Sequence, residues 1–344
     1  GKSNHDHFVT MLSDFGHAEV TGQFDYATLL QSIQNVFVHQ LPSIQTLTSF
    51  RYRPTHSNNF AMTATVLRDD WLRFFTGMDL SLLQPLSLTC SLDSKTEAID
   101  CHVVAPDLAY NGGHYQNVNF IATSPNNQLS CRGSLTKMDD RGLGTDYQLQ
   151  ATAVGNTLRT GLSMDNHAKK QRLRGQLNAD MAFLTNEKNQ VVASFDVKKS
   201  HLFVGDSVYT IHADQLTYSK KHLTIDNLNI ASNSQSIRIN GQASPNREDS
   251  IIVDLNNVNV EYILDLVNFH SVDFSGNVNG KAYLSSLFDT PKAKGNIVVS
   301  NFQFEEGNMG TLNANVRWNN EKKQIDIDAI ALDTMHTDRG IQDR

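Results

Sequence analysis

Apolar and polar positions alternate with a period of two through most of the chain, which is the pattern of a β-strand with one dry and one wet face. In residues 274–284, Phe, Gly, Val, Gly, Ala and Leu alternate with Ser, Asn, Asn, Lys and Tyr. Shorter runs repeat the alternation, separated by turn residues such as Asn111-Gly112-Gly113. We therefore expect an all-β protein built as an antiparallel meander.

Two hairpins are predicted in particular. The alternating runs 86–90 and 99–103 flank turn residues at 93–96, and the runs 312–318 and 325–329 flank the polar segment 319–323. The phase of the alternation changes at 225–228 and again at 329–330. An extra residue in one strand is a common cause of such a change, so we expect β-bulges at both places.

Helical spacing is confined to short segments. Apolar residues at 26, 29, 30, 33, 37 and 41 follow the i, i+3, i+4, i+7 pattern, with Asp25 before them as an N-cap and Pro42 after them. Apolar groups at 71–75 and 262–267 predict two shorter amphipathic helices. We expect these helices as insertions in the β-structure.

The chain contains a loose internal repeat and no obvious linker. An alternating strand, a short apolar helix and a returning strand begin at Phe60 and again at Ile251. No segment rich in proline, or in glycine and serine, divides the chain. We expect one continuous β-rich region over 1–344, with sub-modules at 1–59, 60–249 and 250–332 and a polar tail at 333–344.

The composition excludes some classes of binding partner. The 344 residues are 39% hydrophobic and carry a net charge of −7, without a long cluster of lysine or arginine. Nucleic acid is therefore not an expected partner, because phosphate recognition needs a basic footprint. No apolar run approaches the ~18–20 residues that a membrane-spanning helix requires.

The three cysteines are Cys90, Cys101 and Cys131. Cys90 and Cys101 flank a predicted hairpin turn and would lie near each other on adjacent strands. Two interpretations stay open, a disulfide formed in an oxidising compartment and free, buried thiols.

We find no motif for catalysis or for a cofactor. Nucleotide-binding glycine loops, nucleophile elbows and zinc-protease motifs are absent from the sequence. We expect no enzyme activity, no metal and no cofactor, and we interpret His5-Asp6-His7 as a solvated segment. Trp71 and Trp318 could form a glycan-stacking platform, although aromatic residues on the apolar phase of a strand are usually core.

The continuous alternation has a geometric consequence. A long meander with one apolar face must curl to hide that face, and if it does not close, it forms an elongated groove that can hold acyl chains. The alternative is that the apolar faces pack together as two or three dry β-sandwiches. Alternation alone does not choose between the two.

Several stretches resemble the TamB, or AsmA-like, translocation and assembly module family in its Bacteroidota form. These stretches are residues 22–32, 236–242, 251–260, 274–284 with Pro291, and 313–320 leading into 324–329. Each is a generic strand pattern, and their order along the chain is the specific part of the resemblance, which is densest from about 220 to 332.

The resemblance implies a curled antiparallel β-sheet in the periplasm of a Gram-negative bacterium, in a protein anchored in the inner membrane by a helix outside this sequence. It implies a passive lipid conduit that carries phospholipid towards the outer membrane, and a role in outer-membrane protein assembly. We expect the groove to be lined by apolar residues of the strands, namely Ile237, Ile239, Phe274, Val278, Leu284, Val316, Trp318, Ile325 and Ile327.

Two alternatives belong to other classes. Open edge strands could pair with an outer-membrane β-barrel assembly protein or with its substrate, which would make the chain a scaffold. A glycan-binding β-sandwich is the other.

Overall fold

The computed structural model describes residues 6–70, 79–124, 127–139, 141–169, 172–185, 187, 190–261, 274–305, 307–321 and 324–332. The short helices expected at 71–75 and 262–267 lie outside these residues. The chain divides into two compact units, Gly1–Val191 (unit 1) and Val192–Arg344 (unit 2), and each is described by itself.

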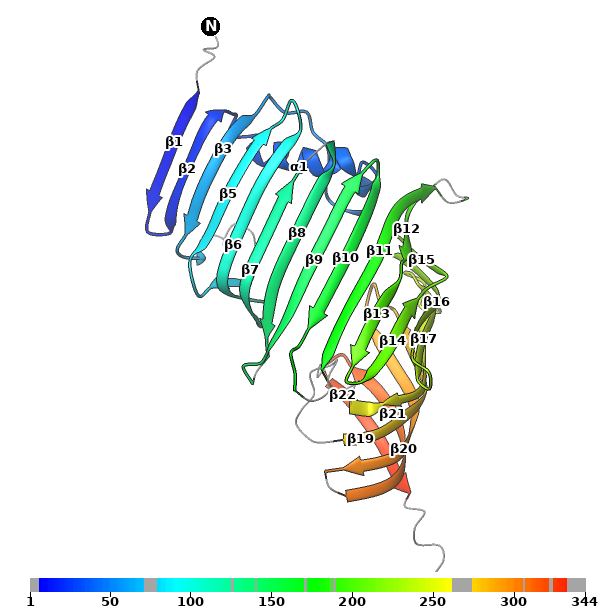
Figure 1. Cartoon of the computed structure of the whole chain (residues 1–344). Coiled ribbons are helices and arrows are strands. Elements are labelled where there is room, and N and C mark those ends of the chain that lie inside the picture. The colour runs from blue at the N-terminus through cyan, green and yellow to red at the C-terminus, as the bar shows by residue number, and fades with distance from the viewer. Residues whose placement is uncertain are drawn as a thin grey trace, which may run out of the picture. The chain divides into compact units, whose positions relative to one another are not determined.

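The all-β prediction is confirmed, because strands make up 67% of the described residues and helices 7%. The strand pairings of the described residues are antiparallel in both units. Figure 1 shows the strands side by side in chain order over most of unit 1.

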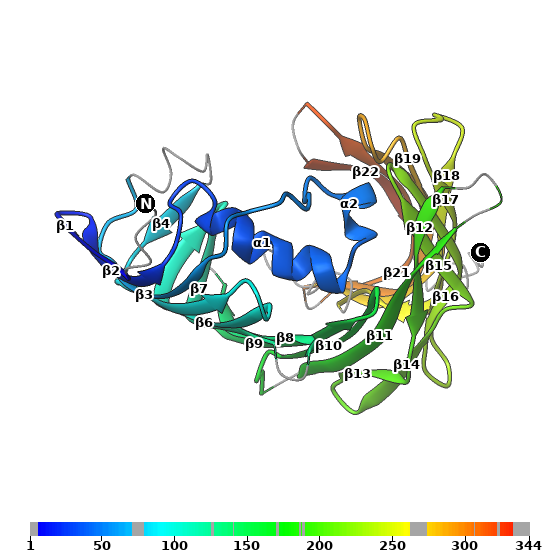
Figure 2. The ribbon, with the colours of Figure 1, turned by 90° about the horizontal axis from the view of Figure 1, so that it is seen from above.

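Unit 1 is a meander with helix α1 on its inner side (Figure 2). The order of strands in its sheet is β1, β2, β3, β5, β6, β7, β8, β9, β10, β11, and β4 pairs with the end of β6. Its elements are β1 His7–Ser13, β2 Gly16–Gln23, α1 Leu29–Gln40, α2 Ile44–Leu47, β3 Asn59–Val66, β4 Leu80–Leu82, β5 Leu86–Asp93, β6 Ala98–Tyr110, β7 Gly113–Thr123, β8 Leu129–Met138, β9 Gly144–Val154, β10 Thr157–Asp165 and β11 Leu173–Thr185.

The first expected helix is confirmed as α1, which lies on the concave side of the curved sheet of unit 1 (Figure 2). The expected N-cap was wrong, because α1 begins three residues later than assumed and Thr28 occupies the N-cap position. Asp25 instead accepts the backbone N–H of Ala27 at 3.0 Å, within the turn that precedes the helix. The four-residue helix α2 was not expected.

Unit 2 is a second curled meander with a fork. From β16 onwards each strand pairs with the next as far as β22, and the opposite edge of β16 pairs with β15 along one half and with β14 along the other. Its elements are β12 Val191–Val197, β13 Ser200–Val204, β14 Ser207–His212, β15 Gln215–Ser219, β16 His222–Ala231, β17 Ser236–Ala243, β18 Ser250–Asn259, β19 Phe274–Ser285, β20 Lys292–Phe304, β21 Gly307–Asn319 and β22 Gln324–Leu332.

Both predicted hairpins are confirmed, and one of the two predicted bulges is. Cys90 pairs with Cys101 across β5 and β6, and Val316 pairs with Ile327 across β21 and β22. The pairing of β16 with β17 shifts between Ile225 and Leu228, which is the expected bulge.

The bulge expected near residue 330 was wrong. The register of β21 with β22 runs without a shift from Asn319 opposite Gln324 to Thr311 opposite Leu332. Ile330 and Leu332 therefore lie on the opposite face of β22 from Ile327, and all three are exposed. An edge strand that is exposed on both faces accommodates apolar residues on either face, so the phase change needs no extra residue.

Glycines allow the strands of unit 2 to approach closely at its apolar face. Gly280 of β19 has a φ of +147°, and a Cβ atom there would lie 2.2 Å from the carbonyl oxygen of Asn296 on β20. A side chain at this position is incompatible with the observed spacing of the two backbones.

Candidate functional site: the apolar sheet faces

The sheet of unit 1 has one apolar and one polar face. Across β9, β10 and β11, Leu149 pairs with Leu162 and Leu162 pairs with Leu177, so these three side chains form one row on one face. Most alternate positions on the same strands are polar and point to the other face; they include Gln148, Gln150, Arg159, Ser163, Gln176 and Asn178. Unit 1 therefore has the two-sided character that the alternation predicts.

Helix α1 seals one half of the apolar face. It packs against β6 and β8, and its Val36 and Leu41 are buried in a core with sheet residues such as Leu92 and Leu129. Leu92 and Leu129 are each only 2% exposed. The full set of buried core residues is Phe24, Val36, Leu41, Phe60, Cys90, Leu92, Ile99, Cys101, Leu129 and Ala153.

An asparagine fixes the N-terminal end of α1. Asn58 is fully buried, and its Oδ1 accepts the backbone N–H of Asp25 at 2.7 Å. Its Nδ2 donates to the hydroxyl of Ser32 at 2.5 Å and to that of Thr28 at 3.2 Å. Because every polar atom of the buried amide is paired, its hydrogen bonds compensate for the cost of removing the amide from water, and the contact holds the helix to the sheet.

A second asparagine fixes the C-terminal end of α1. Asn156, in the turn between β9 and β10, donates its backbone N–H to the carbonyl oxygen of Gln40 at 2.9 Å. Its side chain accepts the N–H of Ser43 at 3.0 Å and donates to the Ser43 hydroxyl at 2.8 Å. Helix α1 is thus attached to the sheet at both ends and covers a defined part of the apolar face.

The other half of the apolar face is uncovered. Leu149, Leu162 and Leu177, which we call the open row, are 40%, 39% and 39% exposed. On β9 the exposure changes abruptly. Ala153 is 2% exposed and belongs to the core, whereas Leu149, four residues away on the same face, lies outside the core. Adjacent exposed leucines on the dry side of a sheet are a feature of binding surfaces.

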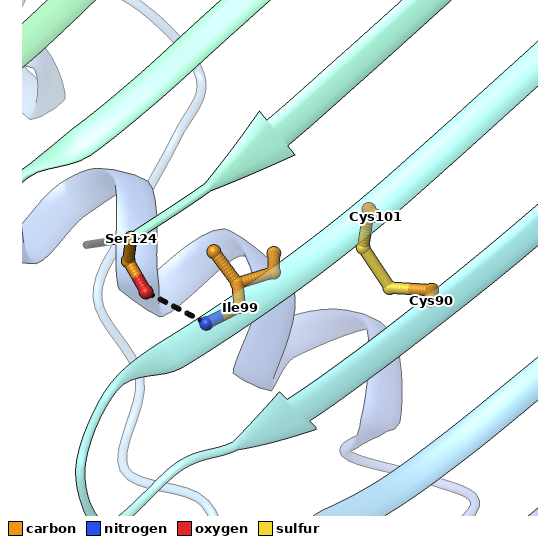
Figure 3. The surroundings of a disulfide bond; sticks show 4 residues. All are labelled: Cys90, Ile99, Cys101 and Ser124. Carbon is orange, nitrogen blue, oxygen red and sulfur yellow. Dashed lines mark hydrogen bonds between the residues drawn. A yellow bond between two sulfur atoms is a disulfide. The ribbon is translucent and has the colours of Figure 1, made fainter.

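A disulfide crosses the covered half of the face. Cys90 of β5 and Cys101 of β6 are direct cross-strand partners with Cα atoms 4.0 Å apart, and they are bonded to each other (Figure 3). The sequence leaves open a disulfide or two free thiols, and the structure contains the disulfide. Close by, Ser124 accepts the backbone N–H of Ile99 at 2.7 Å and so fixes the start of β6 (Figure 3).

The third cysteine lies in the same row of the face. Cys101 is paired with Ala122 of β7, and Ala122 is paired with Cys131 of β8. Cys131 is a free, partly buried thiol, and burial raises its pKa. The protonated thiol is a weak nucleophile, so this residue behaves as a small apolar side chain.

The residues predicted to line a groove lie on one face of unit 2. Ile239 and Val253 are paired, as are Val253 and Ala282, and the row continues through Gly295 to Val316 and Ile327. Two further rows flank this one. Ile237 lies in the row on one side, and Leu284, Trp318 and the backbone of Ile325 lie in the row on the other side.

The burial of these predicted residues differs widely. Val278 is 1% exposed and forms a closed core with Val299 and Phe302, against which Phe274 packs. Ile237, Ile239, Leu284 and Val316 are partly buried. Trp318 and Ile327 are exposed at 38% and 64%. The structure thus brings the predicted residues onto one face, and Val278 is part of its sealed interior.

Ion pairs and hydrogen bonds organise the polar groups at one end of unit 1. Hydrogen bonding to Arg172, at 2.5 Å, lowers the pKa of Asp165 to about 2. Asp146 accepts hydrogen bonds from Thr136 and His167, and its pKa is also lowered, chiefly by Thr136. These carboxylates are ionised at neutral pH and paired, which suits a structural role better than acid–base catalysis.

The described residues contain no group of three or more His, Cys, Asp or Glu side chains arranged to hold a metal ion. In the same part of the chain, no helix has the length and hydropathy needed to cross a bilayer. The chemistry that these surfaces offer is the burial of apolar ligand atoms against leucine, valine and isoleucine side chains.

The open row was missed at the level of the sequence. The signal was present, since Tyr147, Leu149 and Ala151 alternate with Gln148 and Gln150. The predicted groove residues lie in unit 2 instead, because the family resemblance is densest at residues 220–332.

Comparison of the chain with protein-family models, with curated proteins and with solved structures gave no match.

Proposed function

We propose that this protein is a non-enzymatic lipid carrier that binds phospholipid acyl chains on its uncovered apolar sheet faces. The observation that supports this most directly is the open row, in which three leucines on adjacent strands are about 40% exposed beside a sealed core. Such a surface is costly to leave in water, and the three leucine side chains carry no polar group that would select a polar ligand.

The energetics suit passive movement. Burial of one methylene against an apolar surface contributes about 0.8 kcal/mol. Leu149 and Leu177 are two strand spacings apart, on the order of 10 Å, so several methylenes of one chain fit along the row. The leucines are equivalent in chemistry, and an acyl chain would therefore slide between similar positions without a catalytic step.

The disulfide supports a location outside the reducing cytoplasm, since such bonds persist in oxidising compartments. We propose the periplasm, in line with the family resemblance, with phospholipid passing between the inner and outer membranes. The partly exposed apolar residues of unit 2, among them Trp318 and Ile327, would add to the same acyl-binding surface.

Crosslinking tests this function. The purified chain is mixed with phosphatidylcholine that bears a photoreactive diazirine in one acyl chain, irradiated, and mapped by mass spectrometry. We expect crosslinks on β9, β10 and β11 near the open row, and we expect Leu162→Asn to reduce the crosslinked fraction several-fold.

The matched control is Leu184→Asn. Leu184 is on β11 like Leu177, but at an alternate position of the strand, and it is 53% exposed. It offers the same side chain with similar access on the other face. If Leu184→Asn and Leu162→Asn lower crosslinking equally, or if neither does, the open row is not the acyl-binding site.

A second candidate function rests on the two edge strands. Within the described residues, β1 pairs only with β2, and β22 pairs only with β21. Both edges expose large apolar side chains, namely Phe8, Met11, Leu12, Ile327, Ile330 and Leu332. A scaffold that pairs with a strand of an outer-membrane β-barrel assembly protein would use such edges. Replacement of Thr10 in β1 by proline would abolish capture of such a strand without altering acyl crosslinking.

A further inference from the structure

The sequence contains three Asn-Gly dipeptides, and the structure places them in two different environments. Asn111-Gly112 forms the turn between β6 and β7, whereas Asn240-Gly241 lies within β17 and Asn279-Gly280 within β19. Asparagine followed by glycine is the dipeptide most prone to deamidation, because glycine has no side chain to hinder attack of its backbone nitrogen on the asparagine carboxamide. The three sites therefore offer the same chemistry with different surroundings.

The turn at Asn111-Gly112 is exposed and open. Tyr110 and Gly113 are paired at the end of the hairpin, so the two residues between them lie outside the strand ladder. Asn111 has a φ of +47° and Gly112 a φ of +77°, and a Cβ atom at Gly112 would meet nothing within 4 Å. Within the described part of the chain, the Asn111 carboxamide makes no hydrogen bond. The carboxamide and the following peptide can therefore rotate without breaking a strand pairing.

Asn240, in contrast, is held within the sheet of unit 2. Its Oδ1 accepts the backbone N–H of Asn227 at 2.7 Å, at the bulge of β16, where Asn227 has a left-handed φ of +48°. Gly241 is paired with residues of both neighbouring strands, and a Cβ atom there would lie 2.2 Å from the carbonyl oxygen of Ser250. The carboxamide is thus bound across the sheet, and the following peptide cannot turn towards it unless two strand pairings open.

Asn279 repeats this arrangement two strands further on. Its Oδ1 accepts the backbone N–H of Asn257 at 2.9 Å, at the bulge of β18, and Asn257 has a φ of +53°. Gly280 is again paired with residues of both neighbouring strands. In each copy the asparagine accepts the N–H that a bulge removes from the regular ladder. The same hydrogen bond keeps the carboxamide carbon away from the nitrogen of the following glycine.

We propose that Asn111 is a site of spontaneous deamidation, whereas Asn240 and Asn279 are protected from the same reaction by their hydrogen bonds to the bulges. The backbone nitrogen of Gly112 attacks Cγ of Asn111 and forms a C–N bond, and the carboxamide nitrogen leaves as ammonia together with the proton of the attacking N–H. Water then opens the resulting succinimide at either carbonyl, which gives aspartate or isoaspartate. The reaction consumes only water and does not depend on acyl-chain binding.

The isoaspartate product changes the hairpin locally. It adds one methylene to the backbone and a negative charge at a turn whose geometry depends on left-handed asparagine and glycine. The pairing of Tyr110 with Gly113 should therefore loosen. The disulfide between Cys90 and Cys101, near the other end of β6, keeps the rest of that strand in register.

Peptide mapping over time tests the proposal. The intact protein is incubated at mildly alkaline pH in water enriched in oxygen-18, which labels newly formed product, and each site is quantified by tandem mass spectrometry. We expect Asn111 to react about tenfold faster than Asn240 or Asn279, a difference of about 1.4 kcal/mol in activation free energy. The matched control is the same incubation in urea, where the three dipeptides lose their different surroundings and should react at similar rates.

A variant of the turn tests the attacking group. In Gly112→Ala the added methyl group meets no neighbour but hinders the backbone nitrogen, so deamidation of Asn111 should slow several-fold. Because alanine is strained at this φ, circular dichroism and thermal unfolding verify that the variant is folded, and the comparison of the wild-type protein with and without urea does not depend on it. Equal rates at the three sites of the folded protein, a preference for Asn111 that persists in urea, or an unreactive Asn111 in the folded protein would each overturn the proposal.

Discussion

The covered and uncovered halves of the unit 1 face have the same strand pattern and opposite burial. On β9, Ala153 lies in the core under α1 and Leu149 is 40% exposed, although both point to the same face. The sheet itself does not distinguish them. The difference arises from one helix of twelve residues, attached at one end by the side chain of Asn58 and at the other by the backbone N–H and side chain of Asn156.

The largest effect on stability is expected from a substitution in the covered half of the unit 1 face, compared with one in the uncovered half. Leu129→Ala removes a 2% exposed side chain from the core and should lower the free energy of unfolding by about 2–5 kcal/mol. Leu162→Ala removes a 39% exposed side chain of the open row and should change it by less than about 1 kcal/mol. Chemical denaturation monitored by circular dichroism measures both values, and equal losses would contradict the division of the face.

A smaller loss of stability is expected from a substitution at the attachment of α1. Asn58→Ala leaves the backbone N–H of Asp25 and the hydroxyls of Thr28 and Ser32 without their buried partner. We expect a loss of about 1–3 kcal/mol. Hydrogen exchange should show faster exchange in α1 and unchanged exchange in β9 and β10. The exposed Asn315 on β21 provides the control, since Asn315→Ala should have no measurable effect.

Much of this architecture was predictable from local pattern. Alternation and turn residues gave the hairpins at Cys90 with Cys101 and at Val316 with Ile327, and i, i+3, i+4 spacing gave α1. These features depend on neighbours in sequence.

The candidate site was less predictable, because exposure depends on tertiary coverage. Nothing local distinguishes Leu149 from a core residue; it is open because α1 packs on the sheet at the level of Ala153 and not at the level of Leu149. Similarly, Val278 has the alternation of its neighbours but is sealed by Val299 and Phe302, which come from the next strand. The phase change at Ile330 was misread because a free edge strand tolerates apolar residues on both faces.

The smallest expected effect on stability concerns the Asp165–Arg172 ion pair of unit 1 at acidic pH. The folded-state pKa of Asp165 is about 2, below the ordinary value of 3.8, so its pairing with Arg172 stabilises the fold above pH ~4. That contribution is lost as the pH falls from 4 towards 2. Asp165→Asn should therefore cost about 0.5–1 kcal/mol at pH 7 and nothing near pH 2. A pH series of unfolding curves measures the difference, and a gap that widens on acidification would contradict the assignment.

The cysteine arrangement restricts the order in which this chain can be oxidised. Cys131 is separated from Cys101 by the whole of β7, a distance of about two strand spacings, which is too far for a bridge within the native sheet. A bond formed between those two sulfurs in a nascent chain would exclude β7 from its place and trap the polypeptide covalently. Correct maturation therefore requires either that β5 and β6 pair before the bond forms, or that thiol–disulfide exchange reopens the mispaired form.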